Sequence, residues 1–128
     1  MLIERKEVLN EDKSTGYIEA VFNSDNVLKT TYFPKANKLY IAFSRGHTYS
    51  YGNISKELYD EFESASSQGK FFHSKINNKL KYPVHKEFTL YPSEVKDLKE
   101  IVTKKLSEFE ENNKINNYDG ITEDEDDE

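Results

Sequence analysis

The side chains capable of acid-base, nucleophilic or metal chemistry are scattered along this chain. The three histidines, His47, His73 and His85, lack the spacing of metal ligands, and the sequence has no cysteine to assist them. Without cysteine there is also no disulfide framework and no thiol nucleophile. No serine stands in a nucleophile elbow or beside a glycine-rich oxyanion turn. We therefore expect a protein that is not an enzyme and has no metal or cofactor.

The dipeptide Gly69-Lys70 has a superficial likeness to a phosphate-binding loop. Such a loop needs an earlier glycine at a fixed spacing and a Ser or Thr directly after the lysine, whereas Phe71 stands there. We therefore interpret this segment as a structural turn that Phe71 and Phe72 anchor.

A hairpin rich in aromatic residues is a first candidate for binding. Tyr40, His47, Tyr49 and Tyr51 can form a platform on which bases stack, with Lys29, Lys38 and Arg45 meeting phosphates. In the alternative interpretation these rings are ordinary cross-strand pairs and core residues, and alternation alone does not say which sheet face the helices cover. The residues that we predict for nucleic-acid binding are Tyr40, Arg45, Lys70, Lys75, Lys79 and Lys81.

The acidic C-terminus is a second candidate. Its six last residues are Glu123, Asp124, Glu125, Asp126, Asp127 and Glu128. Such a cluster can imitate a nucleic-acid backbone and dock on the positively charged surface of a polymerase. The alternative is a solubilising tail without a partner. Self-repulsion and the lack of apolar residues predict that this tail is disordered in isolation.

Composition limits the fold to one small domain. The chain has 128 residues, of which 35% are hydrophobic and 13% aromatic, so Tyr and Phe must supply the core. Its net charge is −3 over residues 1–25, +5 over 26–90 and −8 over 91–128. No signal peptide or membrane span is visible, which predicts a cytoplasmic protein. The excess of Lys over Arg is typical of AT-rich genomes, including those of many phages.

Alternation and turn residues predict strands at residues 2–9, 17–22, 27–33, 39–44 and 47–51. Asn37 fits a positive φ in one connection, and Arg45-Gly46 makes a tight hairpin turn. Strand 39–44 places Leu39, Ile41 and Phe43 on one face. The basic segment from Lys75 to Lys86 is expected to be exposed, followed by an apolar return at residues 88–91.

Two helices follow from periodicity. Ser55 is an N-cap for a helix that ends near Ser66, and Gly69 suits a left-handed cap beyond it. Its apolar stripe, Ile54, Leu58, Phe62 and Ala65, should pack on the Leu39/Ile41/Phe43 face. The second helix runs from Pro92 to Glu111 and has a long apolar stripe.

The fold class is therefore α+β. We expect a small antiparallel sheet, a meander of three to five strands, packed against two main α-helices, with a disordered acidic C-terminal tail. We divide the chain into an N-terminal lead-in (1–25), a core domain (26–90), an amphipathic helix packed on that core (91–112) and the acidic tail (113–128).

Residues 24–82 resemble the KTSC domain, which occurs at the C-terminus of some lysyl-tRNA synthetases and as a stand-alone bacterial and phage protein. The resemblance rests on Ser24, the Tyr49-Ser50-Tyr51 strand, Ile76 and the turn from Ala65 to Phe72, Ala-Ser-Ser-Gln-Gly-Lys-Phe-Phe. Gly52-Asn53-Ile54-Ser55 departs from the Val-Pro usual in the family. The resemblance implies a fold, a suggested role in RNA binding and no catalytic activity.

The additions around this core, a long C-terminal helix and an acidic tail, resemble the small RNA-polymerase-binding proteins of T-even-type phages. Our first hypothesis is a phage-type adaptor that binds host RNA polymerase and modulates transcription. The alternative is an RNA or single-stranded nucleic-acid binding module that uses the basic, aromatic middle region. A third possibility is an assembly protein whose partner is a second copy of itself.

Overall fold

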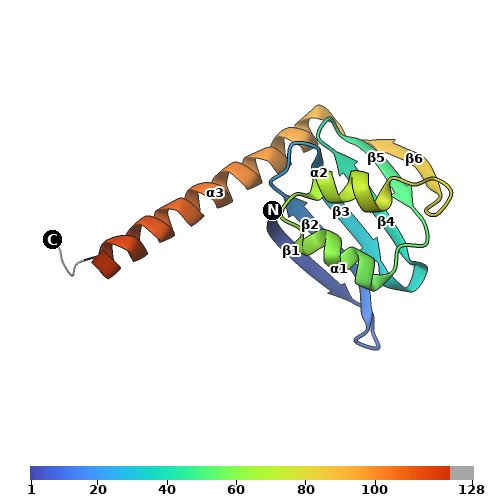
Figure 1. Ribbon diagram of the computed structural model, residues 1–128, viewed down its shortest axis with the longest axis horizontal. Coiled ribbons are helices and arrows are strands. Elements are labelled where there is room, and N and C mark those ends of the chain that lie inside the picture. Colours follow the sequence, from blue (N-terminus) through green and yellow to red (C-terminus); the bar gives the residue numbers. More distant parts are fainter. Residues whose placement is uncertain (122–128) are drawn as a thin grey trace.

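One antiparallel sheet of six strands forms the body of the protein (Figure 1). The structure, a computed structural model, describes the backbone of residues 1–121 and the side chains of residues 1–111. The strands are β1 (Leu2–Leu9), β2 (Thr15–Phe22), β3 (Val27–Phe33), β4 (Lys38–Phe43), β5 (His47–Tyr51) and β6 (Val84–Thr89). They follow one another in chain order, so the sheet is a meander with β1 and β6 at its edges.

Special backbone positions close the connections where the sequence predicts them. A short 3-10 turn, η1 (Pro34–Ala36), joins β3 to β4 and ends at Asn37, which has a left-handed φ of 50°. Gly46 in the β4–β5 turn has a φ of 94°. Such values favour glycine and asparagine, since a Cβ atom penalises them in most other residues. The prediction for Asn37 and the hairpin itself are therefore confirmed, but the expected two-residue turn Arg45-Gly46 is a connection of three residues, Ser44 to Gly46.

Two short helices cover one face of the sheet (Figure 1). Helix α1 (Lys56–Ser64) begins after Ser55, whose side chain accepts a hydrogen bond from the Leu58 N–H, as an N-cap residue does. Helix α2 (Gln68–Phe71) begins after Ser67, which caps it in the same way through the Lys70 N–H. It continues into the π-helical turn η2 (Phe72–Ile76).

The core between these helices and the sheet is largely aromatic. Tyr32 and Tyr59 stack with ring centroids 4.6 Å apart, and Phe62 meets Phe22 edge to face. Leu39 and Ile41 are fully buried here, as the alternation of β4 predicts. Rings of this size bury enough apolar area to compensate for the low hydrophobic content of the chain.

A polar network fastens β1 to α1. Arg5 Nε donates a hydrogen bond of 2.8 Å to Glu63 Oε1, while Glu63 Oε2 accepts one of 2.8 Å from the Tyr59 hydroxyl. The Glu63 carboxylate thus accepts hydrogen bonds from the buried Tyr59 hydroxyl and from Arg5 at once. A buried polar group such as this hydroxyl needs a hydrogen-bond partner.

The third helix, α3 (Pro92–Ile121), differs from the other two. It begins at the β5–β6 end of the sheet, lies against β1, β2 and β3, and then projects from the body (Figure 1). Ile3, Val21 and Leu28 are buried although they lie outside the main core cluster, which fits their being covered by α3. No helix in the described part of the chain is both long and apolar enough to cross a membrane.

Several expectations need correction. The sheet has six strands rather than three to five, because the residues taken as a basic run and an apolar return contain β6. Tyr59 is fully buried in α1, whereas the predicted stripe member Ala65 lies beyond the end of the helix. Helix α3 continues to Ile121, past the predicted end at Glu111.

Gly69 is also not the left-handed cap that the sequence predicts. It lies inside α2, and a Cβ atom placed on it would come within 2.9 Å of the Asn26 side chain. Helix α1 ends instead at Ser64, and its C-cap residue Ala65 has an extended backbone. The glycine therefore allows α2 to approach the β2–β3 connection closely.

Candidate binding surface

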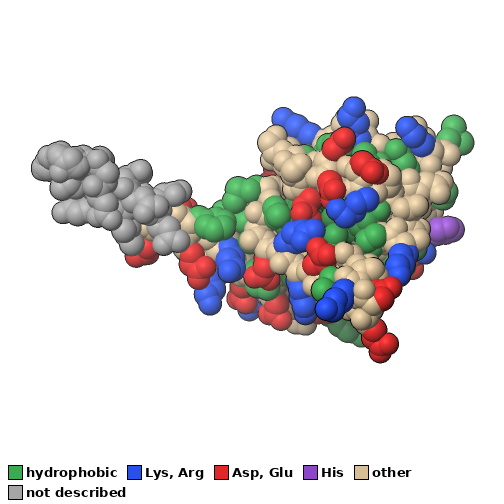
Figure 2. Space-filling view, turned by 90° about the horizontal axis from the view of Figure 1, so that it is seen from below, with side chains coloured by type: hydrophobic (Ala, Val, Ile, Leu, Met, Phe, Trp, Pro, Cys, Tyr) green, Lys and Arg blue, Asp and Glu red, His purple; other side chains and the backbone are tan. Residues whose placement is uncertain are grey.

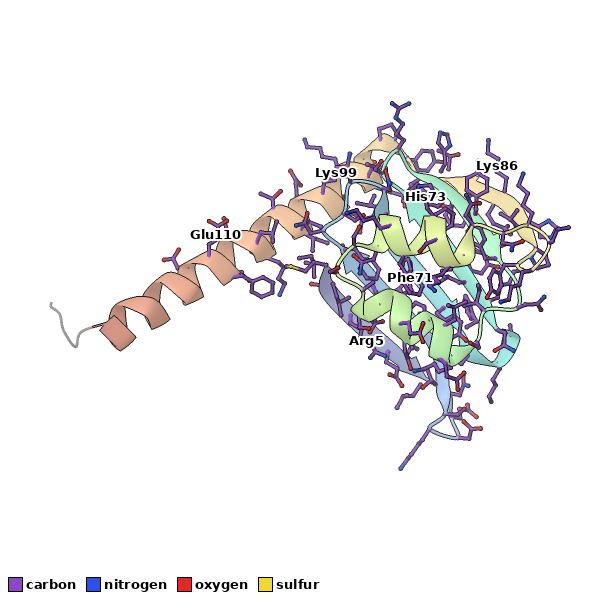
Figure 3. All side chains as sticks on the ribbon, viewed as in Figure 1. Arg5, Phe71, His73, Lys86, Lys99 and Glu110 are labelled. Atoms are coloured by element: carbon purple, nitrogen blue, oxygen red, sulfur yellow. The ribbon has the colours of Figure 1, made fainter. Side chains whose placement is uncertain are left out.

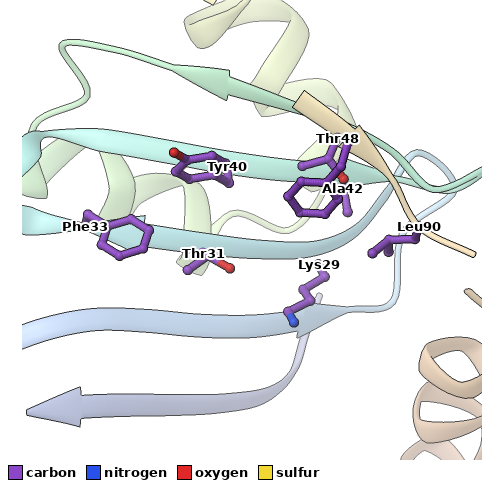
Figure 4. Close-up of a pocket in the computed structure, with 8 residues that line it drawn as sticks. Lys29, Thr31, Phe33, Tyr40, Ala42, Thr48 and Leu90 are labelled. Carbon is purple, nitrogen blue, oxygen red and sulfur yellow. The ribbon is translucent and has the colours of Figure 1, made fainter. Parts of the chain in front are cut away.

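The face of the sheet opposite α1 and α2 carries a hollow with a largely apolar lining. The hollow has a volume of about 350 Å³ and spans β3, β4, β5 and β6 (Figure 4). Its lining consists of Lys29, Thr31, Phe33, Tyr40, Ala42, Thr48, Phe88 and Leu90. We call this surface the open face.

Side-chain size explains why the open face is hollowed. Thr31, Ala42 and Thr48 are small and form its floor, and Ala42 is the direct cross-strand partner of Thr48. Larger residues stand around them, Phe33 and Tyr40 on β3 and β4, and Phe88 on β6 (Figure 4 labels all but Phe88). Small residues between aromatic ones leave a slot of the size of a ring or a branched aliphatic side chain.

An aromatic row continues from the hollow toward β2. The Tyr17 and Phe33 ring centroids are 5.6 Å apart, and those of Phe33 and Tyr40 are 5.7 Å apart. The Lys38 ammonium lies over the Tyr40 ring, 5.5 Å from its centroid, at a distance typical of a cation–π contact. Tyr40 is therefore the member of the predicted platform that does lie on the open face.

Two charged side chains near the hollow, Lys29 and Glu87, each have a polar partner. Lys29 Nζ lies 3.3 Å from Glu19 Oε2, and Glu87 Oε2 accepts a hydrogen bond of 2.6 Å from the Ser50 hydroxyl. A site with paired charges and an apolar lining suits an apolar or aromatic group better than a multiply charged one.

Two other tyrosines of the predicted platform point the other way. In the antiparallel register Tyr49 pairs with Ile41 and Tyr51 with Leu39, so both share the face that α1 and α2 cover. Tyr51 is 6% exposed, and burial raises its pKa to about 12. Burial likewise raises the pKa of Tyr59 far above its usual value. The prediction of a Tyr40–Tyr49–Tyr51 platform is therefore wrong.

The predicted basic residues do not gather around Tyr40. Arg45 lies in the β4–β5 turn, Lys70 in α2, Lys75 in η2, and Lys79 and Lys81 in the connection to β6. Arg45 and Lys70 line two adjoining hollows that share Asn26 and His73, beside the helices rather than on the open face. The sequence had no means of separating these locations, because each lysine is exposed in every plausible fold.

Acidic and basic side chains are mixed on the surface of the molecule. On the side of the molecule that Figure 2 shows, acidic and basic side chains alternate among the described residues. A nucleic-acid binder is expected instead to present a stripe of positive charge.

Histidine and carboxylate side chains form no metal centre in the part of the chain that the structure describes, where no group of three or more possible ligands occurs. His47 and His73 line the same hollow, while His85 belongs to β6. Figure 3 labels His73, and it labels Lys86, the neighbour of His85 on β6. The acidic residues Glu123 to Glu128 lie outside the described residues.

The residues that carry the family resemblance have structural tasks. The Ser24 hydroxyl accepts hydrogen bonds from the N–H groups of Asn26 and Val27 and so shapes the entry to β3. The buried Gln68 amide donates to the carbonyl oxygens of Phe62 and Ala65 at the end of α1. With the Ser67 cap, these contacts hold α2 in place. The motif is thus a signature of the fold.

Sequence reasoning missed most of the open face. Thr31, Phe33 and Ala42 occupy every second position on β3 and β4, between residues that point into the core. The signal in the sequence was therefore the alternation itself, which places small or polar residues on the face away from the core. Phe88 and Leu90 could not be assigned to it while β6 was not recognised.

The comparisons agree with this fold. Residues 23–82 match the KTSC domain family. The crystal structure of a KTSC domain protein from Yersinia pestis is similar, with a TM-score of 0.51 and 28% sequence identity, covering 55% of this chain and 96% of that one. No curated protein matches the chain. Strands β1 and β2, which precede residue 23, and β6 and α3, which follow residue 82, lie outside the matched residues. Over residues 23–82, just under half of its length, this chain is similar to the KTSC domains.

Proposed function

We propose that this protein is a non-catalytic adaptor that binds a protein partner through α3 and the acidic C-terminus, and that RNA polymerase is that partner. The observation that carries the proposal is the course of α3 away from the sheet. All residues from Ser107 to Glu111 are exposed, and Phe109 among them is 41% exposed. A helix gains most of its stability from packing one face, so an unpacked end that displays a phenylalanine is suited to a partner.

Charge supports the choice of partner. Residues 91–128 have a net charge of −8, and exposed acidic residues such as Glu110 lie on the projecting part of α3 (Figure 3). Enzymes that hold nucleic acid present positive surfaces, which attract such a segment in a salt-dependent manner. The long C-terminal helix and acidic tail, which resemble those of small RNA-polymerase-binding proteins of T-even-type phages, add to this choice. The adaptor would act in the cytoplasm of the host and modulate transcription there.

Retention of purified core RNA polymerase on immobilised protein tests the proposal. Phe109→Ala and removal of residues 113–128 should each reduce retention at least fivefold at low salt. Leu80→Ala is the matched control, because Leu80 is also an apolar side chain, 99% exposed, on another part of the surface. No retention of polymerase by the unaltered protein at low salt refutes the proposal.

A second candidate function is binding of single-stranded nucleic acid. It is favoured by the row of Tyr17, Phe33 and Tyr40 with Lys38 beside it, since bases stack on such rings. Binding of a (dU)12 oligonucleotide should fall steeply with salt and be weakened by Tyr40→Ala. Removal of residues 113–128 should strengthen it, because an anionic competitor is lost.

The same oligonucleotide distinguishes the open face from the predicted lysines. If Lys75→Glu with Lys79→Glu weakens binding and Tyr40→Ala does not, the nucleic acid lies on the η2 side. No mobility shift of any oligonucleotide at low salt excludes this function.

A further inference from the structure

The two edges of the sheet are not equivalent. Strand β6 pairs with β5 on one side, and in the described part of the chain no strand pairs with its other side. Five of its six residues are exposed, Val84 being the exception. At the opposite edge α3 lies against β1, and Arg5 of β1 is bonded to Glu63 of α1. Both edges therefore lack an outer strand among the described residues, and β1 is the one that a helix contacts more.

The backbone of β6 is arranged to accept a further strand. The Gly52 N–H donates a hydrogen bond of 2.9 Å to the Pro83 carbonyl, and in the same register Tyr51, Ser50 and Tyr49 face Val84, His85 and Lys86. Closely and widely bonded pairs alternate in an antiparallel ladder, so His85 bonds toward β5 while the N–H and C=O groups of Val84 and Lys86 point outward. Strand addition needs outward-pointing backbone groups on alternate residues, and Val84 and Lys86 provide them.

Apolar surface lies beside this edge on the open face. A bulge between His47 and Tyr49 sets two β6 residues against Thr48. Glu87 and Phe88 consequently both reach the open face, the first bonded to Ser50 and the second lining the hollow. Phe88 is 57% exposed, and Leu90 lies near it. An added strand would place every second side chain against them.

Positive charge lies beside the edge on the other face. Lys86 pairs with Tyr49 and therefore points to the α1–α2 side, where it lines a hollow together with Lys79 (Figure 3 labels Lys86). Every other residue of an added strand would meet these lysines. Carboxylates suit those positions, since they pair with ammonium groups across neighbouring strands.

We propose that β6 is a docking edge for an extended segment of a partner protein. The segment alternates acidic residues, which face Lys79 and Lys86, with aromatic or large aliphatic residues, which pack on Phe88 and Leu90 at the rim of the open face. This proposal is independent of the α3 adaptor function, because it uses another surface.

The β6 strand of a second copy does not have the alternation of acidic and large apolar residues that the proposed segment has. Two-fold antiparallel pairing of β6 with itself, centred on Lys86 or on Glu87, brings like charges directly opposite each other. In these two registers charge repulsion thus disfavours self-association of the edge.

Selection from a display library of random 12-residue peptides on the full-length protein tests the proposal without assuming a sequence. Enriched peptides should alternate acidic and apolar residues and should increase the protection of the Val84 and Lys86 amides from hydrogen exchange. Lys86→Pro should weaken the best peptide at least tenfold, since it removes an outward N–H but no bond to β5. Lys86→Ala, which keeps the N–H and loses the charge, should weaken it two- to fivefold.

Phe88→Ala should weaken the peptide at least fivefold, whereas Leu80→Ala and Phe109→Ala should leave its affinity unchanged. Thermal unfolding of each variant shows that the body is intact. Enrichment of no peptide, or of peptides indifferent to Lys86→Pro and Phe88→Ala, overturns the proposal. A dimer in sedimentation that Lys86→Pro abolishes would assign the edge to a second copy instead. Loss of polymerase retention with peptide binding intact would separate the two proposals.

Discussion

Replacing Gly46 by alanine tests how closely the β4–β5 turn packs against Leu90 and α3 beside the open face. Gly46 lies in the β4–β5 turn with a φ of 94°, and its carbonyl oxygen accepts a hydrogen bond of 2.9 Å from the Leu90 N–H. A Cβ atom at this position would lie 3.2 Å from the Leu90 carbonyl oxygen and 3.0 Å from Val95 Cγ2 of α3. One glycine therefore lets the turn, the end of β6 and the start of α3 meet.

The expected cost follows from two contributions. A positive φ strains an L-residue by about 1–3 kcal/mol. The close approach to a backbone oxygen adds about 1 kcal/mol of overpacking, because the Leu90 backbone is held by its own hydrogen bond. We expect Gly46→Ala to lower the free energy of unfolding by about 2–4 kcal/mol, a large part of the stability of a small domain.

Urea denaturation followed by circular dichroism measures this cost. Gly52→Ala is the matched control, since a Cβ atom there would approach nothing closer than 3.8 Å, and it should change the stability by less than about 0.5 kcal/mol. Combining Gly46→Ala with Val95→Ala should recover the part of the cost that arises from the contact with α3. Equal stabilities of Gly46→Ala and Gly52→Ala would refute the reasoning.

Three further predictions concern the core and its caps. Burial raises the pKa of Tyr51 to about 12 from 10.0, so the folded state favours the neutral phenol. Stability should be complete below pH 10 and fall as the pH rises from 10 to 12, less steeply in Tyr51→Phe, as thermal melts would show. Glu63→Ala should cost about 1–3 kcal/mol because the buried Tyr59 hydroxyl loses its acceptor, while Glu61→Ala on the exposed side of α1 should be neutral in the same urea titration. Ser55→Ala should cost about 1 kcal/mol through loss of the α1 cap, and an unchanged denaturation midpoint would contradict the capping role.

The predictions that held were those that depend on local chemistry. The strand β3 begins and ends where the sequence places it, and Ser55 caps α1 as expected. Asn37 and Gly46 adopt the positive φ values that asparagine and glycine tolerate best in short turns. These features depend on a few consecutive residues, so the sequence determines them directly.

Strand β6 was missed for a physical reason. An edge strand exposed on both faces has no alternation of buried and exposed positions, and its bulge at residues 87 and 88 disrupts the remaining period of two. Gly69 was misread because a glycine after a helix usually caps that helix. Here position 69 must lack a side chain because Asn26, which is distant in sequence, lies too close to leave room for one.

Which sheet face stays open was decided by the tertiary structure alone. The β4–β5 hairpin has Tyr40 on one face and Tyr49 and Tyr51 on the other. A shift of the register by one residue would exchange the two faces. The antiparallel register assigns Tyr49 and Tyr51 to the core and leaves Tyr40 outside it. The sequence by itself determined a KTSC-type α+β body and an acidic C-terminal region. Only the packing of α1 and α2 on one face, and of α3 against β1 to β3, determined which part of the sheet no helix covers.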